Sequence, residues 1–468
     1  MTLGFLVIGL VCAMLLAVGF WASRKAKSSE NYFVGDRNIG ALVTIGTQCA
    51  TFVGGGMTLG WIGLGFSYGL GSIWYGAPQA LGFFFVAAIM VKSMRARGTS
   101  FVSLPDWFDN FYHNEILRMV IALACLIVPV TWVTAQTTAA ARMLQTVGMP
   151  YWIGVLLIGG VVVIFSTIGG YVAVVITDTI QWICLFVIFV CTVSFAIYYA
   201  GGFGAIMDKV PNYMTNPLHV EGMPSYTILL WMVSGLVSGM GLQSTYQRIY
   251  SAKTNEVAVA GLVATGIATI FFAVLTSFVG MAVLCLNGPA DLLKDSVWPW
   301  FLNEYMKPWV SVIYSICIIM ATMSTASSML NSIALTITHD LYARYINPNA
   351  TDKMKLKLGI IVSGVFGVIS IWWAMGGSWM IALFGMSYAV GCGPMAAAVM
   401  IAAIMKEKAN PIFIVAGLIL GIVVGIITLG MPGLAGIPAG GTVFSFFTSL
   451  IIGVFGSLVF KNKKLAAI

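Results

Sequence analysis

An aspartate in an apolar run is the first residue in this sequence whose setting suggests chemistry. Asp178 lies in the run Thr177-Asp178-Thr179, and Gln181 follows within one helical turn. An ionisable group is costly in an apolar environment and by default marks a functional site. Cation binding is the function that this setting favours. The alternative is a carboxylate that caps a helix end, because the preceding pair Gly169-Gly170 leaves the start of the helix open.

A cluster of hydroxyl residues is the second candidate. The run 321–332 contains Ser324, Thr325, Ser327 and Ser328. On a helix that turns about 100° per residue, these hydroxyls cover an arc of roughly 160°, with Ala321 on the same side. A dehydrated Na⁺ is a hard cation that needs several oxygen ligands, and hydroxyls with free backbone carbonyls supply them at low charge density. The alternative is that these hydroxyls only form hydrogen bonds between helices.

No catalytic arrangement accompanies these residues. The three histidines, at positions 113, 219 and 339, fall in expected loops or at a helix end. The sequence has neither a phosphate-binding glycine loop nor an HExxH motif, so an ATP-driven pump and a membrane enzyme are disfavoured. A channel is disfavoured because no filter-like repeat or ring of charges is present. The eight cysteines fall in apolar runs without metal-ligand spacing.

The elements that must position these candidates are membrane-spanning helices. Of 468 residues, 60% are hydrophobic and 8% are charged, whereas a soluble protein carries roughly a quarter charged residues. A helix needs about 20 apolar residues to cross a bilayer, and such runs predict an all-α polytopic membrane protein with about 13 spans. The first run has no basic residue before it and no cleavage site after it, so a retained helix is expected. The spans are expected at approximately 3–22, 40–68, 71–93, 116–146, 149–168, 172–200, 225–248, 255–286, 308–338, 356–376, 378–405, 410–430 and 442–460.

The basic residues divide unequally between the two sides of this arrangement. With the N-terminus outside, 19 of the 23 Lys and Arg fall on cytoplasmic segments, Arg118 and Arg248 among them. Short cytoplasmic loops are enriched in Lys and Arg. We therefore expect a multi-pass protein of the plasma (inner) membrane with the N-terminus outside and the C-terminus cytoplasmic. The net charge of +8 is assigned to these loops rather than to nucleic-acid binding, and no buried Arg or Lys is evident that could bind a carboxylate.

Two spans are poor candidates for continuous helices. The span 40–68 contains Gly54-Gly55-Gly56, and the span 225–248 contains three glycines within 234–241. The two spans lie five helices apart. Glycine-interrupted spans in matching positions of two halves are the best sequence indication of a transporter site made of broken helices. Close packing of small residues is the alternative explanation.

Four segments of the chain resemble the sodium/solute symporter family, whose members carry proline, pantothenate, sugars, sialic acids and choline. The segments are 30–37 (ENYFVGDR), 169–181, 246–253 (YQRIYSAK), and Met323-Ser324-Thr325 leading into 340–342. The resemblance implies one transmembrane transporter domain over 1–468 with a five-plus-five inverted-repeat core. The repeats would span about 40–200 and 225–405, each opening with a broken helix, and 3–22, 410–430 and 442–460 would be peripheral.

The resemblance also implies a sodium site between the first and eighth core helices. Its ligands would be the carbonyls of Ala50, Val53 and Ala321 and the hydroxyls of Ser324 and Thr325. A second sodium would use Asp178, Ser327 and Ser328. The substrate would contact Phe52, Gly54, Gly55, Gln79, Trp132, Leu242, Phe384 and Tyr388.

The predicted function is Na⁺-coupled symport of a small organic solute by alternating access. The choline-carrying branch is nearest in appearance, but Leu81 and Leu242 stand where its aromatic cage for a quaternary ammonium would need further rings. An amine, a zwitterion and an uncharged nutrient are therefore all retained. A proton-coupled carrier and a transporter-like sensor are the alternatives. The expected partners are the solute and the lipid bilayer, without nucleic acid, and a monomer is the simplest assembly.

Overall fold

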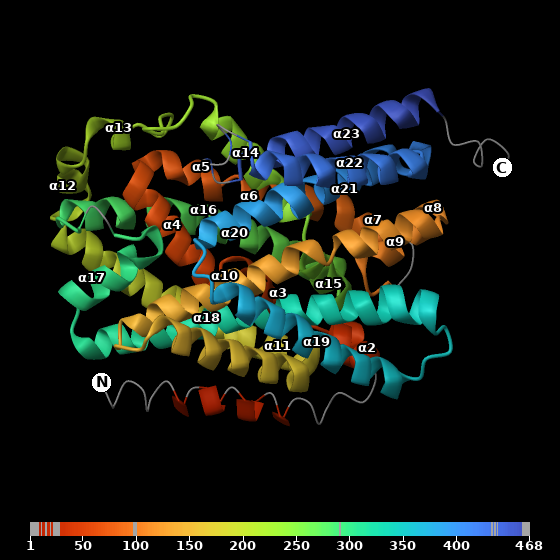
Figure 1. Cartoon of the computed structure of the whole chain (residues 1–468), viewed down its shortest axis with the longest axis horizontal. Coiled ribbons are helices and arrows are strands. Elements are labelled where there is room, and N and C mark those ends of the chain that lie inside the picture. The colour runs from red at the N-terminus through yellow and green to blue at the C-terminus, as the bar shows by residue number, and fades with distance from the viewer. Residues whose placement is uncertain are drawn as a thin grey trace.

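The computed structural model describes residues 29–96, 101–289, 292–431 and 439–460 throughout, with some positions between 9 and 21 and positions 434 and 437. These residues form helices and no strand; one isolated bridge pairs Ile39 with Ala252. The helices run mostly along the long axis of an elongated bundle (Figure 1). The expected span 3–22 lies largely outside the described residues. The prediction of an all-helical fold is confirmed.

The helices that are described in full in the first half begin at Ser29, after the first expected span. They are α2 (Ser29–Val34), η1 (Gly35–Arg37), α3 (Ala41–Phe52), α4 (Gly55–Tyr68), η2 (Gly69–Ser72), α5 (Ile73–Gly76), α6 (Gln79–Phe85), η3 (Val86–Met90), α7 (Val91–Ala96), α8 (Leu104–Tyr112), α9 (Glu115–Ala124), α10 (Ile127–Gln145), α11 (Tyr151–Tyr199), α12 (Gly202–Lys209) and α13 (Asn212–Thr215).

The helices of the second half begin at Thr227. They are α14 (Thr227–Met240), α15 (Gln243–Ser251), α16 (Asn255–Cys285), η4 (Lys294–Ser296), α17 (Val297–Tyr305), α18 (Pro308–Leu335), η5 (Thr336–Ile346), α19 (Asp352–Ala374), α20 (Met380–Ser387), η6 (Tyr388–Cys392), α21 (Gly393–Met405), η7 (Lys406–Lys408), α22 (Pro411–Leu429) and α23 (Thr442–Val459).

Nine helices within the described residues are long and apolar enough to cross a membrane, or ten if the bent pair α14 and α15 counts as one span. Two of the nine, Gly55–Arg95 and Tyr151–Tyr199, contain a glycine at positive φ, Gly69 (58°) and Gly170 (61°). At about 1.5 Å per residue, the second would be more than twice the thickness of a bilayer core if it were straight. The exact number of 13 spans stays a prediction.

Both expected helix interruptions are present. Between α3 and α4, Val53 (φ −94°, ψ 61°) and Gly54 (φ −78°, ψ 173°) leave the helical conformation. Between α14 and α15 the axis bends by 40°, and Leu242 is extended (φ −103°, ψ 119°). The prediction of a broken first helix in each half is therefore confirmed. Each interruption frees backbone groups that an unbroken helix would pair internally.

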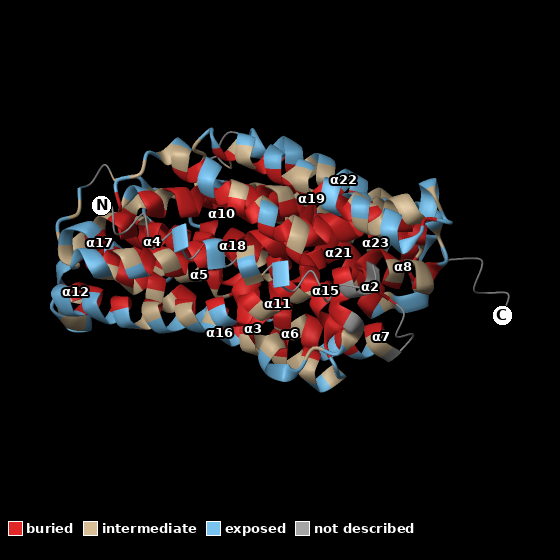
Figure 2. Cartoon of the chain, turned by 90° about the horizontal axis from the view of Figure 1, so that it is seen from below, coloured by how far each residue is buried: buried red, intermediate tan, exposed pale blue. Residues whose placement is uncertain are grey.

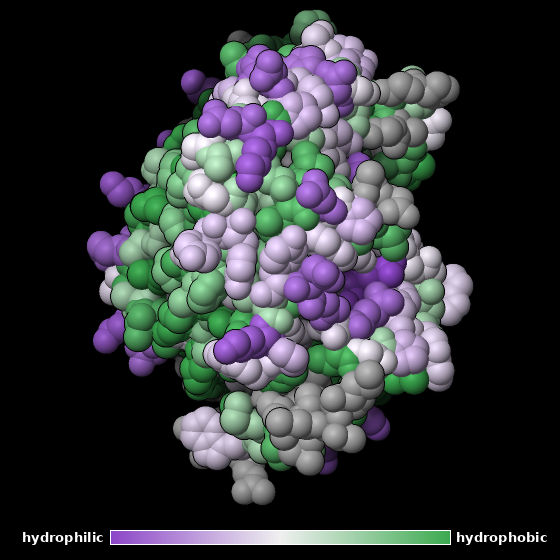
Figure 3. All heavy atoms as spheres, turned by 90° about the vertical axis from the view of Figure 1, so that its left-hand side faces the viewer, coloured by the Kyte–Doolittle hydropathy of each residue, from purple (hydrophilic) through white to green (hydrophobic). Residues whose placement is uncertain are grey.

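The bundle is apolar on its outside and rich in hydroxyl groups inside. Buried residues fill the interior and exposed ones cover the outer faces (Figure 2), and the exposed large side chains include Leu42, Ile180, Trp372 and Phe455. Such outer faces suit contact with lipid tails. The end of the bundle near α12, α13 and α17 instead gathers hydrophilic side chains (Figure 3).

Two arginines that the sequence assigned to cytoplasmic segments are buried, although no buried basic residue was evident from the sequence. Arg118 on α9 is 6% exposed and pairs with Asp106 at 2.7 Å and Asp109 at 2.8 Å, both on α8. Arg248 on α15 is 2% exposed. A buried guanidinium is tolerated only when acceptors surround it. Arg118 lies in the first turn of α9, and Arg248 lies on α15 after the second interruption.

Candidate functional site

The predicted sodium ligands meet where α3 ends against the middle of α18. Thr325 Oγ1 donates to the Ala50 carbonyl at 3.1 Å, and Ser324 Oγ lies 3.5 Å from the same oxygen. Both hydroxyls also bond the Ala321 carbonyl, at 3.3 and 2.8 Å. Four of the five predicted oxygens therefore lie together, two helices contributing them. Ala50 on α3 and Ala321 on α18 are 271 residues apart in the sequence.

The chemistry of this oxygen group fits a hard monovalent cation. Two carbonyls and two hydroxyls, all nearly fully buried, present oxygens without net charge. Ligands held at about 2.3–2.6 Å from a hard ion, the distances known for Ca²⁺, would lie roughly 3.3–3.7 Å apart at right angles. The oxygen spacings above are close to that range, so a small separation of α3 from α18 would suffice.

The glycines of the first interruption are required by close packing against α18 and α10. A Cβ built on Gly54 would overlap Thr325 Oγ1 and lie 3.2 Å from both amide atoms of Gln136. A Cβ on Gly55 would lie 2.7 Å from the Thr322 methyl. Val53 directly precedes this contact as the cap of α3. Small residues here allow the broken backbone to reach the oxygen group.

Asp178 is fully buried and belongs to a second polar cluster. Its Oδ2 accepts from Thr47 Oγ1 at 2.6 Å and Ser328 Oγ at 3.4 Å. Arg248 Nη2 lies 3.3 Å from the same oxygen. Ser327 does not join them, because its hydroxyl donates to the Ser324 carbonyl at 3.1 Å within α18. The structure therefore brings Asp178 and Ser328 together and adds an arginine that the sequence did not assign.

The predicted substrate contacts include a chain of edge-to-face aromatic rings. The ring centroids of Phe52 and Trp132 lie 5.5 Å apart, and those of Trp132 and Phe384 lie 5.1 Å apart. Phe83 on α6 extends the chain at 4.3 Å from Phe52. Leu81 is 53% exposed on the outside of the bundle. Phe83, two residues after Leu81 on α6, instead places an aromatic ring against Phe52.

Polar groups lie next to these rings. Gln79 Nε2 donates to Tyr388 Oη at 3.4 Å, and Trp132 Nε1 donates to Ser387 Oγ at 3.1 Å. Gln136, which the sequence did not single out, accepts from the Gly56 N–H at 2.9 Å. Within the described part of the chain, Gln79 Oε1 and Gln136 Nε2 have no hydrogen-bond partner. One acceptor and one donor beside the rings are thus unsatisfied.

Leu242 is also buried, at the interruption between α14 and α15. Gly241 beside it contacts Cys392, where a Cβ would overlap the backbone. This second interruption therefore packs against η6, the helix that begins with Tyr388.

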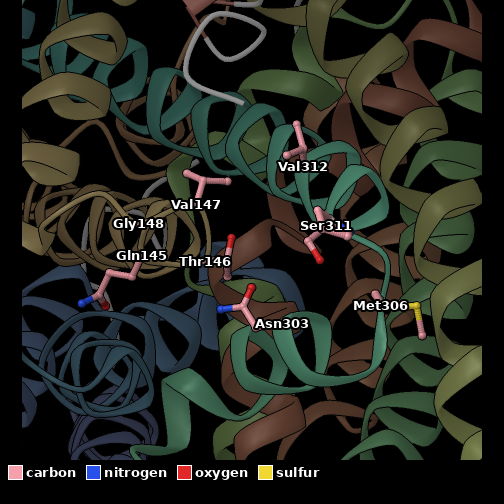
Figure 4. A pocket seen from close by; sticks show the side chains of 9 residues that line it. Gln145, Thr146, Val147, Gly148, Asn303, Met306, Ser311 and Val312 are labelled. Carbon is pink, nitrogen blue, oxygen red and sulfur yellow. The ribbon is translucent and has the colours of Figure 1, made fainter. Parts of the chain in front are cut away.

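Two cavities lie near opposite ends of the helix formed by α18 and η5. One, of about 340 Å³, has Gln145–Gly148 on one side and Ser311 and Val312 on the other (Figure 4). The other, of about 440 Å³, is lined by residues of α8 and η5, including Asp106 and His339. Thr325 is about 20 Å along the helix from each. The predicted site residues line neither cavity and are packed together between them.

Comparison with known proteins relates this architecture to membrane transporters. Residues 32–421 match the sequence profile of the sodium:solute symporter family. The osmoregulated proline transporter OpuE of Bacillus subtilis is 24% identical over 475 residues, covering 98% of this chain and 95% of the relative. The sodium/proline symporter of Escherichia coli is 25% identical, covering 76% and 74% of the two chains. The high-affinity choline transporter 1 of Caenorhabditis elegans is 26% identical, covering 78% and 68%.

Solved structures share the fold. The substrate-bound, outward-open structure of a Na⁺-coupled sialic acid symporter superposes with a TM-score of 0.83 at 20% identity, covering 98% of this chain and 99% of that one. The nucleobase-cation-symport-1 family transporter Mhp1, in a closed conformation, superposes with a TM-score of 0.57 at 13% identity, covering 92% and 93%. The helical arrangement described above is therefore that of a known class of transporters.

Proposed function

The chain belongs to the sodium:solute symporter family, and from this premise we propose that it couples the inward movement of Na⁺ to uptake of a small organic solute. Like its relatives, it is a membrane transporter and not an enzyme. The observation that supports the proposed ion site is the meeting of Ala50, Ala321, Ser324 and Thr325 oxygens at a helix interruption. Val53 completes the proposed ligand set.

The position of the ion site explains how Na⁺ would influence the solute. Ala50 and Val53 flank Phe52, whose ring packs against Trp132. A Na⁺ bound by the two flanking carbonyls would hold the last turn of α3 against α18. This would fix Phe52 in place as one wall of the solute site. The coupling free energy would arise because each ligand binds better when the same turn is already ordered.

The cavities near the two ends of α18 and η5 support alternating access. The site lies about 20 Å along this helix from each cavity, and closely packed side chains separate it from both. Opening one side at a time would expose the ion and solute alternately. The inward membrane potential would add about 2.3 kcal/mol per charge per 100 mV.

We propose an amino-acid-like zwitterion or a small amine as the solute. The aromatic faces of Phe52, Trp132 and Phe384 suit an ammonium group, for which aromatic rings provide favourable electrostatics. The free Gln136 Nε2 suits a carboxylate or carbonyl, and the free Gln79 Oε1 suits an N–H donor. Relatives named for proline and choline transport support the same two classes.

The proposed setting is the plasma (inner) membrane, with the N-terminus outside, the C-terminus cytoplasmic and the monomer as the transporting unit. Under this orientation the cavity near α17 faces outward and the one near α8 faces the cytoplasm (Figure 1).

Uptake into proteoliposomes tests the proposal. Purified chain is reconstituted, and entry of radiolabelled proline and of radiolabelled choline is measured under an inward Na⁺ gradient and with Na⁺ replaced by K⁺. We expect Na⁺-dependent accumulation of at least one of the two. Accumulation that follows a pH gradient and ignores Na⁺ would favour a proton-coupled carrier. Binding of either compound without any accumulation would favour a sensor.

A further inference from the structure

Arg248 lies where the sequence led us to expect a second sodium ion. Its Nη2 donates to Ser328 Oγ at 2.7 Å and to Thr51 Oγ1, and it lies 3.3 Å from Asp178 Oδ2. These three oxygens come from α18, α3 and α11. We propose that this guanidinium is a permanent cation in place of a second Na⁺, so that each chain binds a single Na⁺. This inference rests on the proposed function.

The guanidinium is held firmly at this position. Its Nε donates to Thr47 Oγ1 at 3.1 Å, and its Nη1 donates to the Ser244 carbonyl at 3.1 Å within α15. All three guanidinium nitrogens therefore have acceptors. Arginine presents its donors in a rigid planar arrangement and remains protonated, so it suits a buried fixed charge. The side chain is 2% exposed and Asp178 is fully buried, so bulk water does not screen the pair.

The charge balance of the cluster opposes an additional ion. One guanidinium and one carboxylate give a neutral pair, and an added Na⁺ would leave a net positive charge in a buried region. The Na⁺ would also have to share Thr51, Ser328 and Asp178 Oδ2 with a guanidinium nitrogen already bound to them. Asp178 Oδ1 is free of hydrogen bonds within the described residues. One free oxygen is far short of the several that a hard cation needs.

The location of Arg248 also gives it a function. It joins α15, which follows the second helix interruption, to α3, which precedes the first. Its partner Ser328 lies one helical turn from Thr325 on α18, and its partner Thr51 is next to Ala50. The arginine would therefore link the same helices as a bound ion would, but without dissociating during transport. Only the Na⁺ at Ala50 and Thr325 would then be exchanged with solution.

Counting bound Na⁺ tests this inference without knowledge of the solute. Equilibrium binding of ²²Na⁺ is measured on purified full-length chain in detergent, together with Thr325→Val and Asp178→Asn. We expect one saturable Na⁺ per wild-type chain. The Asp178→Asn variant should still bind one, and Thr325→Val should lose it over the same concentration range.

The alternative results separate this inference from the proposed function. Two Na⁺ per wild-type chain, with one lost in Asp178→Asn, would overturn the inference and leave Na⁺ coupling intact. No saturable binding in the wild type would overturn both. As an independent check, Arg248→Ala should gain a second Na⁺ in the vacated cluster and Arg248→Lys should not. Equal Na⁺ counts in these two folded variants would contradict the inference.

Discussion

The Thr325 hydroxyl should determine sodium affinity. Thr325 Oγ1 lies 3.1 Å from the Ala50 carbonyl and 3.3 Å from the Ala321 carbonyl. Thr325→Val keeps the shape of the side chain but replaces one of the proposed ligands with a methyl group. An interaction with a charged group contributes about 1.5–3 kcal/mol. At about 1.4 kcal/mol per tenfold change, the Na⁺ affinity should fall about 10- to 150-fold.

The assay is the Na⁺ dependence of solute uptake, with Thr322→Val as the matched control. Thr322 lies three residues earlier on α18, and among the described residues its hydroxyl donates only within that helix, to the Ile319 carbonyl at 2.7 Å. The half-saturating Na⁺ concentration should rise in Thr325→Val and stay near the wild-type value in Thr322→Val. Uptake at saturating Na⁺ should recover in Thr325→Val. Equal Na⁺ dependence in the two variants would refute the proposed ligand role.

Two further predictions concern the first interruption and the end of the bundle near α17. Gly54→Ala should weaken Na⁺-dependent uptake about tenfold or more, because its Cβ would overlap Thr325 Oγ1 and such overpacking costs about 1–3 kcal/mol. The control is Gly160→Ala, whose Cβ would meet no neighbouring atom within 4 Å, and this variant should transport normally. Normal uptake in both variants would refute the close contact at Gly54. Burial raises the pKa of Asp295, in the short helix η4 before α17, from 3.8 to about 7. The folded chain then keeps a proton that the unfolded chain releases, so stability should fall as pH rises from about 4 to 7. Asp295→Asn, which retains an acceptor for the Met380 N–H, should flatten the decline in melting temperature between pH 5 and 8, and an unchanged slope would count against this explanation.

Features set by local sequence were predictable. The interruption after Phe52 follows from consecutive glycines, which destabilise a helix wherever it lies. The serines and threonines of α18 fall on one face because of the helical repeat. Their partner, the Ala50 carbonyl, came only from family resemblance, because backbone oxygens leave no pattern in the sequence.

The burial of a side chain, and the direction in which a helix face points, were not predictable in the same way. Arg248 follows an apolar run, so a rule based on charge assigned it to a loop. Its burial depends on the bend between α14 and α15, which turns the next helix into the bundle. Phe83 and Leu81 are two residues apart on α6 and therefore face about 200° apart. Phe83 is buried and Leu81 is exposed, and this difference depends on the packing of α6 against its neighbours.

In the proposed site, Na⁺ is held between the end of α3 and the middle of α18. The most direct measurement is a pair of high-resolution structures of the purified chain, one prepared in Na⁺ and one in K⁺. We predict a density peak, present only in Na⁺, within coordination distance of Ala50 O, Ala321 O, Ser324 Oγ and Thr325 Oγ1. A Na⁺-specific peak elsewhere, with these four oxygens still bonded to one another, would contradict this sodium site.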